Sequence, residues 1–327
     1  MHLNHVELFC DVVARRSFSK AAEAAGISQS SASQAVQALE ERLGAQLIDR
    51  SKRPLELTAA GEIYFDGCRD LLESFRRIED RVLQLQDKVT GRVRVAAIYS
   101  VGLLQMGAYA GRFRELYPDA ELDLDYLHPD EVYNRVLGDE TDLGLVSFPR
   151  EGGSLSSIRW QDQPMVLVVP SRHALAGSSK IRVAEIAGEN YVGFTEELTI
   201  RRAIDRWLRQ SHVSVNVVHE FDNIENIKRA VEIGAGVAIL PEPTVRREVE
   251  AGALSQVRLA DVRWTRPLGI VHRRNKTLST AASRFVEILL SDEDAAVESG
   301  NGAPRASRLH KNGKSANGRA SGRRVPR

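Results

Sequence analysis

The segment Ser17–Gly44, SFSKAAEAAGISQSSASQAVQALEERLG, predicts two short helices joined by a tight turn. Ser17 can cap the first helix, and the alanines that follow are strong helix formers. Gly26 can adopt the left-handed conformation that ends a helix. Ser28 can then cap a second helix over about 29–42. Two helices with such a connection form a helix-turn-helix.

The two helices are expected to pack through small and apolar residues across the turn, with Ala21, Ala22, Ala25 and Ile27 facing Ala32, Val36 and Leu39. The opposite face of the second helix is rich in short hydrogen-bonding side chains: Gln29, Ser30, Ser31, Ser33, Gln34 and Gln37. Such groups can reach base edges in a major groove of DNA. The alternative interpretation is an alanine-rich helical hairpin with a solvated polar face.

The flanking segments fit the DNA-binding interpretation. The apolar spacing of His2–Arg15 predicts a third helix with one buried face. Residues 46–61, QLIDRSKRPLELTAAG, contain two short apolar runs around a polar turn, which predicts a hairpin wing. Arg50, Lys52 and Arg53 lie at the expected tip, where they could meet a phosphate backbone. A solvated charged loop is the alternative.

A long helix is predicted from Thr58 to about Lys88. Its apolar positions alternate spacings of four and three, a heptad pattern that forms a seam along one side. We call these positions the dimer seam: Tyr64, Cys68, Leu71, Phe75, Ile78, Val82 and Leu85. A narrow apolar stripe needs a partner, most simply the same helix of a second subunit.

Composition bounds the class of protein. The 327 residues are 43% hydrophobic and 27% charged, as in soluble globular proteins, and no apolar run is long enough for a membrane helix. Two cysteines, Cys10 and Cys68, and a polar N-terminus indicate a reducing cytoplasm and no secretory signal. The net charge of +1 neither supports nor excludes DNA binding, although the residues after Glu298 are basic and free of acidic side chains.

After Gly91 the pattern alternates strands and helices, which predicts α/β architecture with parallel sheets, two lobes and a cleft between them. The predicted strands are 92–98, 121–127, 142–148, 165–169, 190–194, 215–221, 237–240 and 268–271, and a helical segment ends near Tyr117. Further helices are predicted over 131–137, 198–210, 224–232, 242–250 and 279–290. From Ser291 the Gly-, Ser- and Arg-rich composition predicts a disordered tail.

Ligands of open α/β sheets bind at the carboxyl ends of the strands. A helix N-terminus directly after the first strand can hold an anion, which makes Tyr99, Ser100, Val101 and Gly102 the first effector-binding candidates. His128, Ser147, Thr195 and Asn223 follow later strands and are candidates for the same cleft. Each could instead be an ordinary helix cap or loop hydroxyl. Together they indicate a small polar or anionic ligand.

The sequence offers little for catalysis. It contains no phosphate-binding GxxxxGK[ST] loop, no GxSxG elbow and no HExxH zinc helix, and its histidines and cysteines have no metal-ligand spacing. We therefore predict no enzymatic activity, no cofactor and no metal. Arg201, in a predicted helix, is interpreted as a solvated side chain.

The segment FSKAAEAAGISQSSASQAVQALEERLGAQLIDRSKRPLELTAAG resembles the N-terminal domain of LysR-type transcriptional regulators, and DLGLVSFP and GAGVAILPE are similar to parts of the family's effector domain. The resemblance covers about 3–290. It implies a winged helix-turn-helix, a dimerising linker helix and a two-lobed domain like a periplasmic binding protein. It further implies a homodimer or homotetramer that binds double-stranded promoter DNA in the cytoplasm and responds to a small metabolite, with RNA polymerase as a candidate partner.

Two positions depart from the family pattern, which often has proline where this chain has Ser30 and a basic residue where it has Gln34. The operator preference is therefore not carried over. The expected base or backbone contacts are Gln29, Ser31, Ser33, Gln34 and Gln37, with Ser30 capping or contacting phosphate. The expected phosphate contacts are Ser19, Lys20, Arg50, Lys52 and Arg53.

The expected domains are 1–60 for DNA binding, 61–90 for the linker helix, 91–160 with 267–292 for lobe I, 161–266 for lobe II and 293–327 for a disordered basic tail. The predicted function is sequence-specific transcriptional regulation modulated by an effector in the cleft. The alternative is a solute-binding or enzymatic α/β module with a helical oligomerisation appendage, which would not need residues 1–88 for ligand binding.

Overall fold

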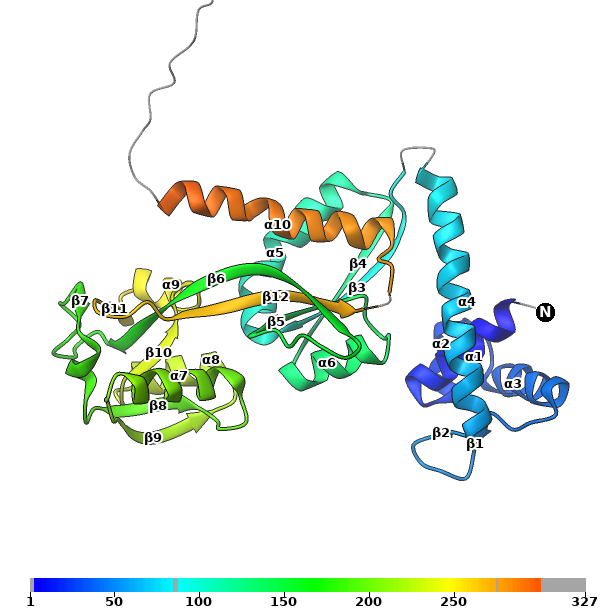
Figure 1. The fold of residues 1–327 in the computed structure, drawn as a ribbon, viewed down its shortest axis with the longest axis horizontal. Coiled ribbons are helices and arrows are strands. Elements are labelled where there is room, and N and C mark those ends of the chain that lie inside the picture. Colours follow the sequence, from blue (N-terminus) through cyan, green and yellow to red (C-terminus); the bar gives the residue numbers. More distant parts are fainter. Residues whose placement is uncertain (1–2, 85–87, 275, 301–327) are drawn as a thin grey trace, which may run out of the picture. The chain divides into compact units, whose positions relative to one another are not determined.

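The computed structural model describes residues 3–84, 88–274 and 276–300 (Figure 1). Leu85 of the predicted dimer seam and residues 301–327 of the predicted tail lie outside these described residues.

The N-terminal part is a winged helix-turn-helix, as predicted. Its elements are α1 (Leu3–Arg15), α2 (Phe18–Ala24), α3 (Gln29–Leu43) and the antiparallel pair β1 (Ile48–Asp49) and β2 (Glu56–Leu57). The Ser17 Oγ accepts a hydrogen bond from the Lys20 amide at 3.3 Å, and the Ser28 Oγ accepts one from the Ser31 amide at 3.1 Å, so both predicted N-caps form. Gly26 takes the left-handed φ of +66° that the turn requires.

The core of this domain brings together the three helices and the wing. Ala21 and Ala22 are buried with Ala32, Val36 and Leu39, as predicted, and α1 adds Phe9 and Val12. Ala25 and Ile27, however, are exposed, so their predicted place in the contact between the two helices is wrong. The bulky side chains of α1 pack into this core instead. Ala25 and Ile27 flank the left-handed residue Gly26, where the chain turns away from the buried face.

Helix α4 (Ala59–Gln84) begins where the Thr58 Oγ1 accepts a hydrogen bond from the Gly61 amide at 3.0 Å. The first part of the predicted dimer seam is used within the subunit, because Cys68 is buried against Val6 of α1 and Tyr64 packs on the same cluster. The remaining described seam residues, Leu71, Phe75, Ile78 and Val82, are exposed. An apolar row is therefore left uncovered along the second half of the helix.

The α/β region begins with β3 (Gly91–Ile98), and its elements up to the first crossing between lobes are α5 (Tyr99–Leu116), β4 (Ala120–Leu127), α6 (Pro129–Leu137), β5 (Leu143–Ser147) and β6 (Leu155–Pro170). They continue with β7 (Lys180–Ile181), the 3-10 helix η1 (Val183–Ile186), β8 (Asn190–Phe194), α7 (Thr199–Gln210), β9 (Asn216–Phe221), α8 (Ile224–Glu232) and β10 (Ala238–Pro241). The last elements are the 3-10 helix η2 (Glu242–Thr244), α9 (Arg246–Glu250), β11 (Leu254–Leu259), β12 (Thr265–Arg273) and α10 (Thr280–Gly300).

The sheets are mixed and not simply parallel, which corrects the prediction. β3 is parallel to β4 and β5, and β8 is parallel to β9. β12 instead runs antiparallel to both β5 and β6, and β6 also pairs antiparallel with β10 and β11. Strand and helix alternation could not predict this, because the chain returns to the first lobe at β12 after building the second.

Several boundaries also differ. The predicted strands 165–169 and 268–271 are parts of the longer β6 and β12, and β7 and β11 were not predicted. The predicted helix 242–250 is divided at Val245, which has a φ of −114°, into η2 and α9. Helix α10 continues to Gly300, past the predicted end at 290, because SDEDAAVES contains no helix-breaking residue before that glycine.

Two hydrophobic cores divide the α/β region into lobes. The first combines β3–β5 with α5, α6 and α10, where Phe113 and Phe285 meet edge to face at 5.4 Å. The second contains residues between Met165 and Trp264. Figure 1 shows β6 and β12 running side by side from one lobe to the other. These two strands connect the lobes, and β12 contributes Arg266 to the cavity described below.

Candidate DNA-binding surface and effector cleft

The predicted DNA-reading face of α3 is open to solvent. Gln29, Ser30, Ser31, Gln34 and Gln37 are exposed and Ser33 is half-buried. At the start of the helix the hydroxyls of Ser30 and Ser31 each lie 2.8 Å from the Ser28 Oγ. Further along, the Gln37 side chain donates to Glu41 at 3.0 Å. The surface thus presents neutral donors and acceptors that can rearrange to meet base edges.

Arg50 lies beside α3. Its guanidinium pairs with Glu40 at 2.9 Å, donates to the Ser33 Oγ at 3.2 Å and lies 5.3 Å from the centre of the Phe18 ring. Glu40 also accepts hydrogen bonds from the amides of Leu47 and Ile48, which ties the start of the wing to α3. Arg50 therefore braces the recognition helix as well as presenting charge.

The tip of the wing is basic and exposed. Lys52 pairs with Glu56 at 3.3 Å, and both side chains are more than half exposed, so this pair contributes little stability and yields readily to phosphate. Arg53 donates to the carbonyls of Arg50 and Lys52, at 3.0 Å each. The exposed residues Ser19 and Lys20 lie at the start of α2. The sequence-predicted DNA-contact residues are thus all on this small domain.

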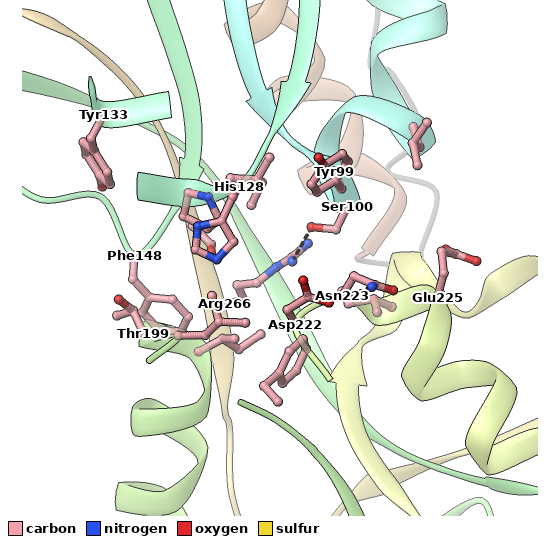
Figure 2. Close-up of a pocket in the computed structure, with 18 of the residues that line it drawn as sticks. Tyr99, Ser100, His128, Tyr133, Phe148, Thr199, Asp222, Asn223, Glu225 and Arg266 are labelled. Atoms are coloured by element: carbon pink, nitrogen blue, oxygen red, sulfur yellow. Dashed lines mark hydrogen bonds between the residues drawn. The ribbon is translucent and has the colours of Figure 1, made fainter. Parts of the chain in front are cut away.

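A cavity of about 90 Å³ lies between the two lobes (Figure 2). Five of the eight predicted effector residues line it: Tyr99, Ser100, His128, Ser147 and Asn223. They come from the first turn of α5 and from positions directly after β4, at the end of β5 and after β9. The carboxyl ends of the parallel strands converge on this cavity, which is the physical basis of the prediction.

Three predicted effector residues do not line the cavity. Val101 is fully buried in the core of the first lobe. Gly102 packs against the Tyr126 ring so closely that a Cβ there would lie 2.2 Å from a ring carbon. Both follow Ser100 on a helix, and the helical rotation turns them inward. Thr195 is also absent from the lining, and its amide donates to the Phe221 carbonyl at 3.1 Å.

The sequence did not predict Arg266, which lies at the cavity wall on β12. Its Nε donates to Gln163 Oε1 at 3.1 Å and its Nη1 donates to the Ser100 Oγ at 3.0 Å. The residue is 1% exposed and forms no ion pair with any carboxylate in the described part of the chain. Burial lowers the pKa of Arg266 to about 9, so it keeps its charge at neutral pH.

The second lobe contributes acidic groups. Asp222 and Glu225 line the cavity near Asn223, which caps α8 by accepting from the Asn226 amide at 2.9 Å. Glu225 pairs at 2.8 Å with the buried Lys228. Figure 2 shows Asp222 and Asn223 on one side of Arg266 and His128 on the other. The cavity is therefore polarised, with the Arg266 cation on β12 and carboxylates on the second lobe.

Aromatic side chains connect the cavity to the second lobe. Phe148, a lining residue, has a φ of +49° and donates its amide to the Pro267 carbonyl at 2.8 Å. Its ring lies 6.3 Å from that of Trp207, which stacks on Trp264 at 5.4 Å. A non-glycine residue in the left-handed region is strained, and the strain is located at the cleft between the lobes. Occupation of the cavity should therefore alter tryptophan fluorescence.

The interpretation of Arg201 as a solvated side chain is wrong. It is 6% exposed and pairs with Asp205 at 2.9 Å and with Glu220, which joins α7 to β9. In the described residues no group of three or more His, Cys, Asp or Glu side chains is arranged to hold a metal ion. No described helix is both long and apolar enough to cross a membrane.

Comparison with known proteins decides the family. Residues 3–62 match the model of the bacterial regulatory helix-turn-helix proteins of the lysR family, and residues 86–293 match the LysR substrate binding domain. The chain belongs to the LysR family. Relatives of this LysR-family chain include a probable RuBisCO transcriptional regulator of Cyanidioschyzon merolae, 29% identical over 88% of this chain and 97% of the relative. A RuBisCO operon transcriptional regulator of Allochromatium vinosum is 27% identical over 89% and 96%.

Solved structures agree on the fold. A full-length OxyR variant from Pseudomonas aeruginosa is 20% identical and covers 89% of this chain and 94% of its own, with a TM-score of 0.71. The CcmR regulatory domain of Synechocystis in complex with 2-PG is 26% identical, with a TM-score of 0.56, and covers 62% of this chain and 97% of its own. The LysR-family chain is thus a DNA-binding transcriptional regulator with an effector-binding domain, and its relatives are regulators rather than enzymes.

Proposed function

We propose that this LysR-family regulator binds promoter DNA as a homodimer, with α3 in the major groove and the wing on the flanking phosphates. The observation that carries the proposal is the exposed hydrogen-bonding face of α3 beside the basic wing, on one compact domain. The proposed contacts are those predicted from the sequence, and Gln34 is the residue that we expect to set base preference. RNA polymerase is the proposed partner of an activating complex.

The proposed domains keep the sequence-based boundaries: 1–60, 61–90, 91–160 with 267–292, and 161–266. The two hydrophobic cores support the division between lobes, because the first ends at Trp160 and resumes at Leu268. A small polar or anionic effector in the cavity would bias the relation of the lobes through β6 and β12, and so the DNA contacts of the dimer.

A gel-shift assay with DNA from the chain's own promoter tests the proposal. Binding should be selective over scrambled DNA of equal length and should weaken steeply with salt. Equal affinity for both fragments, or no binding at low salt, would reject it.

Lys52→Ala is expected to weaken DNA binding evenly across sequences and to lower the salt slope of the logarithm of the affinity by about 1 per subunit. The reason is the loss of one exposed ammonium whose present partner, Glu56, is itself solvated. Fluorescence anisotropy measures the slope between about 50 and 200 mM salt, a range in which phosphate contacts change the affinity strongly. Lys180→Ala, an exposed lysine in β7, is the matched control and should leave the slope unchanged. An unchanged slope in the Lys52 variant would remove the wing from the interface.

Ser100→Leu is expected to abolish the effector response while operator affinity stays within about twofold, because the site and the DNA-binding domain are separate. The leucine fills the cavity and removes the hydroxyl that accepts from Arg266. A promoter–reporter strain grown on a range of carbon and nitrogen sources measures the response, and Ser100→Ala is the control that keeps the cavity open. Loss of operator binding in the leucine variant would contradict separate sites.

A further inference from the structure

We infer that the cleft selects a small ligand with one anionic group, a carboxylate or phosphate ester, at Arg266 and with a hydrogen-bond donor, a hydroxyl or an ammonium, at Asp222. This rests on the proposed effector role of the cavity and names the class of molecule that it takes.

The first support is the electrostatic isolation of Arg266. Its hydrogen-bond partners, Gln163 and Ser100, are neutral, and the described part of the chain gives it no carboxylate. A buried charge without a counter-charge is unfavourable, whereas an anion brought by a ligand would pair with a guanidinium that is already dehydrated and fixed in position. Ser100 keeps acceptor and donor capacity for the same ligand group.

The second support is the helix that begins at the same wall. α5 has 18 residues, and its N-cap residue, Ile98, offers no side-chain cap, so the first amides point to the end of the helix without that partner. The positive end of the helix dipole therefore acts together with Arg266 on one side of the cavity. Figure 2 shows the Arg266 side chain reaching toward Ser100 in this first turn.

The second lobe offers an acceptor to a ligand donor. Asp222 accepts a hydrogen bond from the Asn223 amide group at 2.8 Å and forms no ion pair within the described residues. Glu225 is paired with Lys228, whereas the exposed Asp222 carboxylate has no cationic partner among the described residues and is open to a donor on the ligand. A hydroxyl or ammonium on the ligand would donate to it, whereas a second anionic group would be repelled.

The size of the cavity restricts the ligand further. Its volume of about 90 Å³ is far below the roughly 300–1,000 Å³ of pockets that hold drug-sized molecules. A cavity of this volume favours a short molecule with charge at one end and a donor at the other.

Titrations of the full chain test the inference, followed by the midpoint of thermal unfolding and by tryptophan fluorescence. The probes are glycerate, β-alanine and glycerol 3-phosphate, which combine one anionic group with donors. Malonate carries carboxylates at both ends, and glycerol carries no charge. At least one of the first three should bind at least tenfold more tightly than malonate and glycerol, and comparing glycerate with glycerol 3-phosphate separates carboxylate from phosphate recognition.

Variants separate recognition from simple structural support. Arg266→Met should weaken binding of the preferred probe at least tenfold while the ligand-free unfolding midpoint changes little, because removal of an uncompensated buried charge offsets the loss of the hydrogen bonds to Gln163 and Ser100. Arg266→Lys should retain binding within about tenfold, since it keeps the charge without the guanidinium fork. Asp222→Asn should reduce the discrimination against malonate. Arg201→Met, which removes a buried arginine that is paired, is the control and should lower the midpoint without changing probe selectivity.

Three results would overturn the inference: no response to any of the three anionic probes, equal binding of malonate or glycerol, or retained probe binding in Arg266→Met. If Arg266→Met does not fold, Arg266→Lys and Asp222→Asn test the roles of the two residues. The comparison of probes on the wild type depends on none of these variants. DNA binding is measured separately by gel shift, so its loss in the wild type would reject the proposed function and not this ligand preference.

Discussion

Replacing Phe75 and Ile78 together by glutamate is expected to convert the dimer into monomers and to weaken binding to a two-half-site operator by about 10²- to 10⁴-fold. Both residues are exposed, with Ile78 61% accessible. Together with Leu71 and Val82 they form the exposed part of the dimer seam. Four large apolar side chains in a row on one helix favour a second helix as their cover. Four glutamates facing one another across the pair would repel.

The expected loss of operator affinity follows from the linkage of two half-sites in a dimer. A dimer that has bound one half-site holds its second domain near the other at a high effective concentration, and the separated monomers lose that advantage. Sedimentation analysis measures the assembly, and anisotropy titrations with one-half-site and two-half-site DNA measure the affinity. The monomer should bind both DNAs almost equally.

Ile63→Glu is the matched control for the seam. Ile63 is 78% exposed on the same helix but falls outside the alternating row, so the charge should leave the dimer intact. Dimers that persist in the Phe75 and Ile78 double variant at micromolar concentration would show that α4 is not the dimerising element.

Gly61→Ala should unfold or loosen the DNA-binding domain, lowering its free energy of unfolding by about 3 kcal/mol or more. A Cβ at Gly61 would lie 2.0 Å from the Leu47 carbonyl oxygen and 2.9 Å from its carbon. Backbone cannot move aside as a flexible side chain can, and Leu47 is buried at the start of the wing. The displaced wing would take Lys52 and Arg53 with it, so DNA affinity should fall together with stability.

Gly67→Ala is the same substitution on the same helix, but we expect it to raise the free energy of unfolding and not to lower it. No atom lies within 4 Å of a Cβ at Gly67, so alanine should raise the free energy of unfolding by up to about 1 kcal/mol through its higher helix propensity. Chemical denaturation followed by circular dichroism measures both variants. Equal effects of the two substitutions would contradict the close contact between α4 and the wing.

Local residue patterns were sufficient to predict the helix-turn-helix. Ser17 and Ser28 cap amides three residues further along the chain, and Gly26 needs only its own backbone conformation. Their capping and turn roles were therefore predictable from the sequence and are confirmed. Tyr99 and Ser100 line the cavity, as expected for a helix N-terminus directly after a buried strand, and their part in effector binding stays a prediction. Ile27 was misplaced because α1, distant in sequence from the turn, fills the corner.

The cation of the cleft could not be predicted from the sequence. Arg266 precedes the predicted strand 268–271 in the segment TRPLGI, where a charged residue ordinarily faces water. It is buried because β12 returns between β5 and β6, a pairing that depends on contacts about a hundred residues apart, such as that with Gln163. The burial of Arg201 on α7 was not predicted for the same reason, since its partner Glu220 lies on the strand β9.

Hydroxyl-radical footprinting of the full chain on its own promoter tests whether the protein binds DNA as a dimer through α3. A dimer that places α3 of each subunit in a major groove should protect two half-sites whose centres lie a whole number of helical turns apart, about 10 base pairs per turn, on one face of the DNA. Uniform or single-site protection, unchanged when the promoter is replaced by scrambled DNA, would contradict the account.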